Sequence, residues 1–279
     1  MQEIAVVTGS SSGIGYETAL LLARSGYYCC ATMRNTERAA PLKTIKEREN
    51  LPLSIFQLDV NCDVSVEKTL SQIEKKFGEI DILINNAGYG LIGSLEDLSL
   101  EETRQQFETN FFGSIRLIKR VLPLMRTRKK GVIVNVSSGA GIIGFPCMSA
   151  YASAKFGLEG LSESIMYEVL PFGIRIIIIE PGVVKTDFVK NSVTAKRATR
   201  KNSPYIDILK KIEKNVNFMQ EHATHPADVA NVILHAINDD KPQLRYLVGN
   251  DIAMVAEAKR NMSEAEFRRI MMQEVLQGV

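Results

Sequence analysis

The sequence predicts an α/β protein of the doubly wound class, in which helices cover both faces of a parallel sheet of about seven strands. Short apolar runs alternate along the chain with amphipathic segments, and such alternation implies βαβ crossovers. The run 174–179 is apolar except for Arg175, which is typical of a strand buried on both faces. A glycine-rich turn follows the first apolar run and precedes an amphipathic segment, which predicts a strand-turn-helix unit at the N-terminus.

The expected elements follow one another in a regular order. Strands are expected over 3–8, 27–33, 53–58, 80–85, 131–137, 174–180 and 244–248. Helices are expected to begin near residues 13, 36, 63, 98, 150 and 226. Residues 251–279 predict a terminal helical extension, in which Ser263 and Glu266 have the spacing of a capping box.

Length and composition are those of one ordered globular domain. The chain has 279 residues, of which 45% are hydrophobic and 24% charged, and its formal net charge is +2. An α/β domain of roughly 200–250 residues buries a sizeable core. This balance gives no sign of disorder or of a strong polyanion-binding protein. Without repeats or a Pro/Gly-rich linker, we expect a single domain over 1–250, followed by the extension 251–279.

The sequence disfavours a secreted protein, an integral membrane protein and a nucleic-acid-binding protein. The N-terminus enters a strand-like run directly, without the cationic and apolar regions of a signal peptide. The longest apolar stretches fall far short of the ~18 residues of a membrane span. We therefore expect a cytoplasmic protein with no integral membrane segment. The basic run 126–130 precedes Gly131 and is typical of a helix C-terminus rather than of a nucleic-acid surface.

The cysteines and histidines do not have the spacing of metal ligands. The four cysteines lack the density of a disulfide scaffold, so we expect buried free thiols at Cys29, Cys30, Cys62 and Cys147. Adjacent Cys29 and Cys30 would point to opposite faces of a strand. The spacing of His222, His225 and His235 relative to nearby carboxylates does not indicate a metal site either, and no metal is expected.

Residues 185–225 depart from the alternation. Nine Lys or Arg and three Asp or Glu lie between Lys185 and Lys214. An irregular insertion after a late strand, on the carboxyl side of the sheet, is where a lid over a binding site would lie. A solvated, mobile surface loop is an equally good interpretation at this point.

The glycine-rich turn predicts an anion-binding loop. Glycines let the backbone turn tightly and approach a pyrophosphate, and the following helix offers unpaired N–H groups and the positive end of its dipole. The residues that would form this cradle are Gly9, Ser11, Ser12, Gly13, Ile14 and Gly15. A turn that needs glycine only for steric reasons is the alternative.

Tyr151 and Lys155 predict acid/base chemistry. Four residues apart on a helix, they share one face, so an ammonium would lie beside a phenol and lower its pKa. Ser138 precedes Tyr151 by thirteen positions, at the end of the apolar run 132–136. More often such a pair is only a half-buried Tyr beside a solvated Lys. The other motifs of the chain therefore decide between a catalytic and a structural interpretation.

These elements together resemble the short-chain dehydrogenase/reductase family. The resemblance covers about residues 3–190 and includes, in the family's order and spacing, Thr8-Gly9-x-x-x-Gly13-Ile14-Gly15, Asn85-Asn86-Ala87-Gly88, Asn110, Ser138, Tyr151-x-x-x-Lys155 and Pro181-Gly182 with Thr186. It implies a single-domain Rossmann-type fold. The stretch 31–34 and the longer C-terminal part look most like the 17β-hydroxysteroid-dehydrogenase-like branch.

The resemblance implies a catalytic role for four residues. Tyr151 would donate a proton to the carbonyl oxygen that receives negative charge after hydride transfer, and Ser138 would hydrogen-bond the same oxygen. Lys155 would lower the pKa of the phenol and bind the nicotinamide ribose. Asn110, inside a predicted helix, would hold a water that links Lys155 to solvent.

The resemblance also implies the cofactor contacts. Beside the glycine-rich loop, Tyr151 and Lys155, these would be made by Asp59, Val60, Asn86, Ala87, Gly88, Pro181, Gly182, Val184 and Thr186. An NAD site would carry Asp or Glu at the end of the second strand. Arg34 stands there instead and suits a 2′-phosphate. We therefore expect NADP(H), with NAD(H) as the alternative.

The substrate is predicted to be lipophilic. Ser138 and Tyr151 would face it, together with Ile143, Phe145 and Met148. The expected reaction interconverts a secondary alcohol and a ketone or aldehyde. A 3-oxoacyl thioester reductase is the alternative, because the basic segment 185–225 would attract an anionic carrier. A non-catalytic dinucleotide-binding regulator is the alternative of another class. Homodimers or homotetramers form in many relatives through helices corresponding to 98–125 and 151–170.

Overall fold

The computed structural model describes residues 2–200 and 202–276 and contains the predicted seven-stranded parallel sheet. The strand order is β3-β2-β1-β4-β6-β7-β9, and every neighbouring pair is parallel. The strands are β1 (Ile4–Val7), β2 (Tyr28–Met33), β3 (Leu53–Gln57), β4 (Ile80–Asn85), β6 (Gly131–Val136), β7 (Ile174–Pro181) and β9 (Arg245–Val248). All seven expected strands are confirmed, and the doubly wound class with them.

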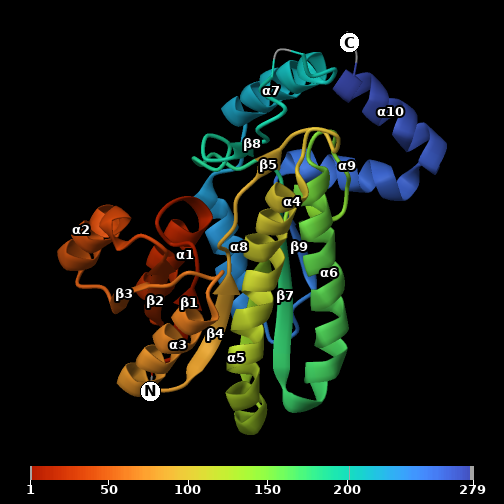
Figure 1. The fold of residues 1–279 in the computed structure, drawn as a ribbon. Helices are drawn as coiled ribbons and strands as arrows, with labels where there is room; N and C mark the ends of the chain where they lie inside the picture. Colours follow the sequence, from red (N-terminus) through yellow and green to blue (C-terminus); the bar gives the residue numbers. More distant parts are fainter. Residues whose placement is uncertain (1, 201, 277–279) are drawn as a thin grey trace.

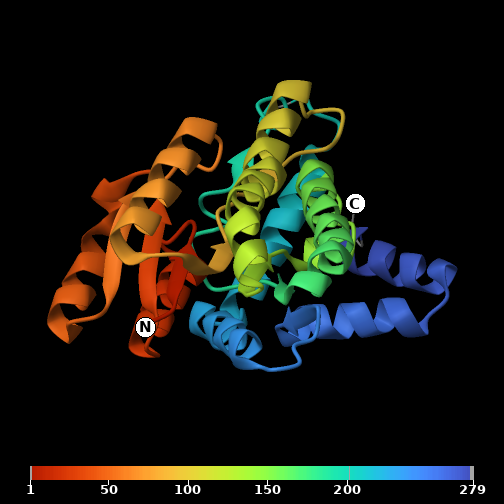
Figure 2. The ribbon, with the colours of Figure 1, turned by 90° about the horizontal axis from the view of Figure 1, so that it is seen from below.

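Helices cover both faces of this sheet, as can be seen in Figure 2, which looks along the strands. One layer holds α1 (Gly13–Arg24), α2 (Ala40–Glu49) and α8 (Pro226–Asn238). The other holds α3 (Asp63–Phe77), α5 (Gly113–Arg128) and α6 (Ser149–Val169). Both layers are needed because each strand buries side chains on its two faces.

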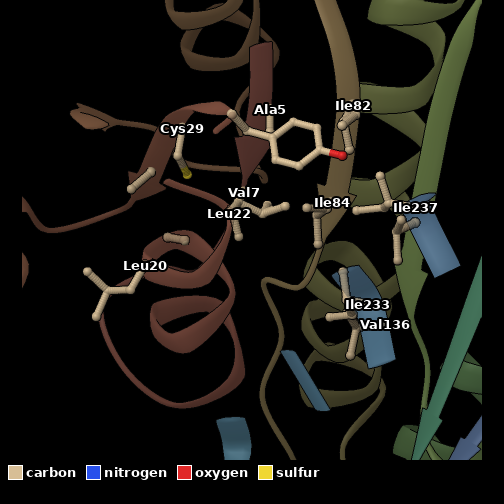
Figure 3. Packing of buried hydrophobic residues seen from close by; sticks show 14 of the residues in the cluster. Ala5, Val7, Leu20, Leu22, Cys29, Ile82, Ile84, Val136, Ile233 and Ile237 are labelled. Carbon is tan, nitrogen blue, oxygen red and sulfur yellow. The ribbon is translucent and has the colours of Figure 1, made fainter. Parts of the chain in front are cut away.

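The hydrophobic core therefore has two parts, one on each face of the sheet. Successive side chains of a strand point to opposite faces and so belong to different parts. Val7 and Ile84 pack with Leu22 of α1 and Ile233 of α8 in one cluster (Figure 3). Val6, one position earlier, belongs to the cluster on the opposite face. The neighbouring Cys29 and Cys30 divide in the same way, as expected. Cys62 corrects the expectation of buried thiols, because it is exposed at the residue that precedes α3.

The order of the sheet reverses at β1, which lies between β2 and β4. Crossovers leave on opposite sides there, and in open α/β sheets the ligand crevice lies at such a point, outside the carboxyl ends of the strands. Thr8 links the ends of β1 and β4. Its Oγ1 donates to the carbonyl of Ile84 (3.2 Å) and accepts from the N–H groups of Asn86 (2.9 Å) and Ala87 (3.0 Å). The predicted site residues gather at this edge.

Three consecutive helical elements form one continuous helix beside this edge of the sheet. It consists of α4 (Leu100–Phe107), a π-helical turn (Glu108–Phe112) and α5. Ser99 and Glu102 form a capping box at its start. The π-turn contains Asn110 and marks a local departure of the kind that is frequent at functional sites.

Residues 185–225 are more regular than expected. Within this segment, β8 (Val193–Thr194) pairs with β5 (Leu91–Ile92) in a separate two-stranded sheet. The helix α7 follows and spans Ile206–Glu221. Apolar Ile206, Leu209 and Ile212 recur at helical spacing, although lysines stand between them. In Figure 1 these elements lie beyond the carboxyl ends of the strands.

The C-terminal extension is helical, as predicted. It consists of α9 (Asn250–Asn261) and α10 (Glu264–Leu276), and residues 277–279 lie outside the described part. The Ser263 backbone N–H donates to Glu266 Oε2 (3.1 Å), and the Glu266 N–H donates to Ser263 Oγ (3.3 Å), so the capping box is confirmed. α10 packs near α7. Among the helices of 2–200 and 202–276, we find none with the length and apolarity that crossing a membrane requires.

Candidate active site

The loop after β1 requires glycine at three positions. Gly9 and Gly13 have φ angles of +68° and +61°, which side-chain-bearing residues rarely adopt. A Cβ on Gly9 would also lie 2.9 Å from the Cα of Ala87. A Cβ on Gly15 would collide with the Asn86 amide and lie 2.5 Å from the carbonyl oxygen of Gly9. The glycines thus fix a tight turn that leads into α1.

The N-terminus of α1 fits an anionic group. Ser12 is its N-cap residue but makes no side-chain capping hydrogen bond, and the first turn holds no acidic residue. The N–H groups and the positive dipole end are therefore not compensated by a nearby carboxylate. The residues present fit the pyrophosphate of a dinucleotide. Ser11 and Ile14 are partly accessible on this loop, as such contacts require.

The residues expected around the adenosine lie along the same edge. The exposed Arg34 follows β2, whose Thr32 carbonyl accepts from the Ser10 N–H of the glycine-rich loop (3.0 Å). Asp59 follows β3, and its Oδ1 accepts from the N–H of Asn61 (3.0 Å). Val60 is buried against Gly113. The cofactor roles of these residues stay predictions.

Asn86 and Asn110 are tied to backbone groups. Asn86 Nδ2 donates to the carbonyl of Thr8 (2.9 Å). The Asn110 amide holds both sides of Tyr89: Nδ2 donates to its carbonyl (3.0 Å), and Oδ1 accepts from its N–H (3.2 Å). Its side chain also faces Gly88. The role of Asn110 in holding a water near Lys155 stays a prediction.

The chain after β7 passes back toward the glycine-rich loop. Buried Pro181 ends the strand, and the Gly182 N–H donates to Val248 of β9 (2.9 Å). Val184 is buried and forms an isolated bridge with Thr224. The Thr186 side chain lies against Gly13, where an added Cβ would be 3.1 Å from its Cγ2. This segment and the loop therefore bound the crevice from two sides.

Tyr151 and Lys155 lie in the first two turns of α6, and each is only 5% exposed. Lys155 Nζ donates to the carbonyl of Val136 at the end of β6 (2.8 Å) and lies 5.9 Å from the centre of the Tyr151 ring. Ser138, two residues after that strand, accepts from the Ala140 N–H (3.1 Å). The strand end thus fixes both the ammonium and the hydroxyl relative to the phenol.

The electrostatics differ from the sequence expectation in one respect. Burial raises the pKa of Tyr151 to about 12, although the Ser138 hydroxyl acts in the opposite direction. Burial lowers the pKa of Lys155 to about 8, and the Glu159 carboxylate opposes this. The expected depression of the Tyr151 pKa is thus wrong for the protein alone, because desolvation outweighs the hydrogen bond with Ser138. The phenol is held in its neutral, proton-donating form.

The apolar surroundings of Tyr151 come from two segments. Phe145 and Met148 pack against the cluster that contains Tyr151, whereas Ile143 is buried outside that cluster. The Phe188 ring, which the sequence did not single out, lies 5.9 Å from that of Tyr151, between centroids. It comes from residues 185–225, and only the tertiary fold brings it here.

Charged side chains behind Lys155 were also missed. Glu159 of α6, Glu180 of β7 and Arg245 of β9 meet in the structure, with 3.0 Å between Arg245 Nε and Glu159 Oε2. Glu159 alone had a sequence signal, because it stands one helical turn after Lys155.

Comparison with known proteins gives a consistent result. The model of the short chain dehydrogenase family matches residues 3–197. An uncharacterised oxidoreductase of Bacillus subtilis is 40% identical, with 91% of each chain covered. Bovine retinol dehydrogenase 8 is 39% identical over 86% of this chain and 79% of its own. A 3-ketodihydrosphingosine reductase of Bacteroides thetaiotaomicron is 34% identical over 88% of both.

Solved structures agree with the fold. A short-chain dehydrogenase from Streptomyces avermitilis has a TM-score of 0.85 and 30% identity, over 99% of this chain and 98% of that one. The structure of ElxO with NADP bound has a TM-score of 0.75 and 28% identity, over 91% and 100%. Strand order, glycine-rich loop, Tyr151–Lys155 pair and sequence match thus lead to one assignment: the chain belongs to the short-chain dehydrogenase/reductase family.

Proposed function

We propose that this protein is an NADP(H)-dependent oxidoreductase that interconverts a lipophilic secondary alcohol and its ketone, with Tyr151 as general acid and base. The observation that carries the proposal is the burial of Tyr151 and Lys155 at the carboxyl edge of the sheet, beside Ser138 and on the same edge as the uncompensated N-terminus of α1. An acid, an oxyanion partner and an anion cradle are thus brought to one crevice.

The residues of the chain divide the work of a carbonyl reduction. When bound, a nicotinamide dinucleotide supplies the hydride. The neutral Tyr151 phenol then gives its proton to the substrate oxygen, and the Ser138 hydroxyl hydrogen-bonds that oxygen as its charge grows. Lys155, held by the Val136 carbonyl, provides positive charge beside the phenolate that remains. Asn110 fixes the Tyr89 segment that borders the crevice.

Cofactor choice is assigned to NADP(H) through Arg34. Its guanidinium is exposed at the end of β2, where an NAD site would carry a carboxylate. A 2′-phosphate would accept charge-assisted hydrogen bonds from it. The structural relative ElxO binds NADP, which supports the same assignment.

The substrate class follows from the apolar wall and from the relatives. Phe145, Met148 and Phe188 surround Tyr151. The names of two relatives refer to retinol and to 3-ketodihydrosphingosine, both long apolar molecules. We therefore assign a retinoid-, steroid- or lipid-like carbonyl to this site. The resemblance to the 17β-hydroxysteroid-dehydrogenase-like branch places a steroid ketone among the first compounds to test.

Residues 185–225 are assigned as a lid. The Phe188 ring lies at a tilt beside that of Tyr151. Ser203 donates to Oδ2 of the buried Asp97 (2.8 Å) and attaches the segment to the loop between β5 and α4. The extension contributes to the same region: Asp251 of α9 accepts from the Val183 N–H (2.7 Å). We thus assign 1–250 as the dinucleotide-binding and catalytic domain, with α9 packed on its rim.

The decisive experiment replaces Tyr151 with Phe. Turnover of ketones is measured by NADPH absorbance, and dinucleotide affinity by fluorescence. Tyr151→Phe should lower kcat by about 10²–10⁴-fold and leave NADPH binding intact, because only the transferable proton is lost. Tyr167→Phe, on the exposed side of the same helix, should match the parent protein.

The outcomes distinguish the alternatives. NADPH binding without turnover of any carbonyl in the parent protein would favour a dinucleotide-binding regulator. Faster and strongly salt-sensitive turnover of a 3-oxoacyl thioester would favour the acyl reductase, whose anionic substrate the basic lid would attract. Undiminished turnover in Tyr151→Phe would contradict the mechanism itself.

A further inference from the structure

A group of charged side chains, two of them buried carboxyl groups, lies between α6 and the sheet, one helical turn beyond Lys155. Glu159 follows Lys155 by four residues and is 5% exposed, and Glu180 at the end of β7 is 2% exposed. Arg245 of β9 contacts both, with its Nε 3.0 Å from Glu159 Oε2 and 3.5 Å from Glu180 Oε1. Its Nη2 lies 2.7 Å from Oε2 of the half-exposed Glu163.

The sheet register explains why these residues meet. Ile174 and Ile176 of β7 pack in the cluster that α6 covers, and Glu180 continues the same alternation. Arg245 pairs in register with Ile178, so its side chain lies on that face too. One guanidinium from a neighbouring strand therefore serves two carboxyl groups, one on α6 and one on the sheet beneath it.

The two buried carboxyl groups are short of hydrogen-bond partners. Glu180 Oε1 is buried without one, and Glu159 Oε1 and Ser137 Oγ have only each other. An added Cβ at Gly141 would lie 2.5 Å from Ser137 Oγ and 3.2 Å from Glu159 Oε1, so glycine leaves room for this cluster. Two carboxylates beside a single guanidinium cannot both ionise cheaply in a buried site, which favours the retention of one proton.

The direction of the pKa shifts agrees with this geometry. Burial raises the pKa of Glu180 to about 7, and the neighbouring Glu159 carboxylate raises it further while Arg245 opposes both. Burial also raises the pKa of Glu159. Since the two groups interact, the titration belongs to the pair. The charged groups that act on the pair are Lys155 of α6 and Arg245 of β9, and Glu163 of α6 shares Arg245. From α9, Asp251 accepts from the Val183 N–H and Lys259 donates to the Ile142 carbonyl, so both are engaged with other segments.

We propose that Glu159 and Glu180 are positioning residues that hold one proton between them and whose changing charge keeps Lys155 an ammonium while the enzyme turns over. The proposal rests on the proposed function for its catalytic consequence, and on the buried cluster alone for the shared proton.

The proposal has a direct physical meaning. With the shared proton in place, the pair carries one negative charge; after its loss, two. The second charge develops near neutral pH, and burial also lowers the pKa of Lys155, to about 8. Each added negative charge close to an ammonium favours the charged form. Lys155 thus stays charged at a pH where burial alone would neutralise it.

Three variants test the proposal: Glu159→Gln, Glu180→Gln and, as a matched control, Glu163→Gln. The control removes a carboxylate from the same Arg245, but on the half-exposed side. We measure kcat against pH from 5.5 to 10. The high-pH limb should move to lower pH by about one unit in Glu159→Gln. The shift should be smaller in Glu180→Gln, which keeps the nearer carboxylate, and absent in the control.

A second readout does not depend on turnover. A carboxyl group with a raised folded-state pKa contributes stability below its unfolded pKa, and this is lost as pH rises through the folded value. Glu180→Gln should therefore melt several degrees above the parent protein at pH 8 and lose that advantage at pH 4.5. The control should follow the parent protein at both.

The two readouts separate the claims. A melting difference that does not depend on pH would overturn the shared proton, even if Glu159→Gln failed to fold. A confirmed melting difference with unshifted activity profiles would overturn the coupling to Lys155. Absence of turnover in the parent protein would contradict the proposed function, while the melting curves would still test the shared proton.

Discussion

The two ends of the β-sheet hold charge in opposite ways. At the amino end, Arg128 lies 2.9 Å from Asp81 and 3.1 Å from Glu79, and each of these pairs retains contact with water. At the carboxyl end, Lys155 is almost fully buried and donates to a backbone carbonyl instead of a carboxylate. Below it, Glu159 and Glu180 compete for one arginine.

This difference separates stability from function within one sheet. Partly exposed ion pairs with good geometry add modestly to stability. Buried charges with too few partners lower it, since desolvation exceeds the attraction they recover. Such groups are retained where their shifted pKa values serve chemistry. The carboxyl end therefore gives up stability that the amino end does not.

The largest test exchanges one cation at each end. Lys155→Met should lower kcat by about 10²-fold or more and raise the melting temperature, because a desolvated ammonium is removed. Arg128→Met should leave kcat unchanged and destabilise the fold by about 1–3 kcal/mol, because Asp81 loses a partner. Steady-state kinetics and calorimetry measure both. Equal loss of activity in the two variants would contradict the division.

A second test concerns the glycines. Gly15→Ala places a methyl group against Asn86 and the Gly9 carbonyl, and should weaken NADPH binding by about tenfold or more through a strain of 1–3 kcal/mol. Gly160→Ala lies in the middle of α6 with open space around it, and should stabilise the protein by about 0.5–1 kcal/mol. Unimpaired NADPH affinity in Gly15→Ala would argue against the loop as the cradle.

A third test concerns the exposed cation at the end of β2. Arg34→Ala should weaken NADPH binding by about 10–100-fold and leave NADH binding unchanged, since only the 2′-phosphate loses charge-assisted hydrogen bonds. Arg48→Ala, an exposed arginine of α2, is the control. Equal weakening of both dinucleotides would show that Arg34 does not discriminate between them.

The sequence predicted the seven strands because each is a short apolar run between turns. It also indicated the residues of the active-site motifs, since their spacing along the chain is itself the signal. The meeting of Glu159 with Arg245 had no such signal: 86 residues separate them, and they meet because β9 pairs with β7. Phe188 reaches Tyr151 in a segment that looked irregular, because lysines interrupt its apolar positions.

The sequence by itself determined the sheet, the glycine-rich turn and the helical spacing of Tyr151 and Lys155, all of which depend on local patterns. Only the tertiary structure decided the sign of the electrostatics. Spacing predicted a lowered phenol pKa, whereas burial raises it to about 12 and lowers that of Lys155 to about 8. Desolvation depends on every element packed around a group, and therefore no local pattern in the chain contains it.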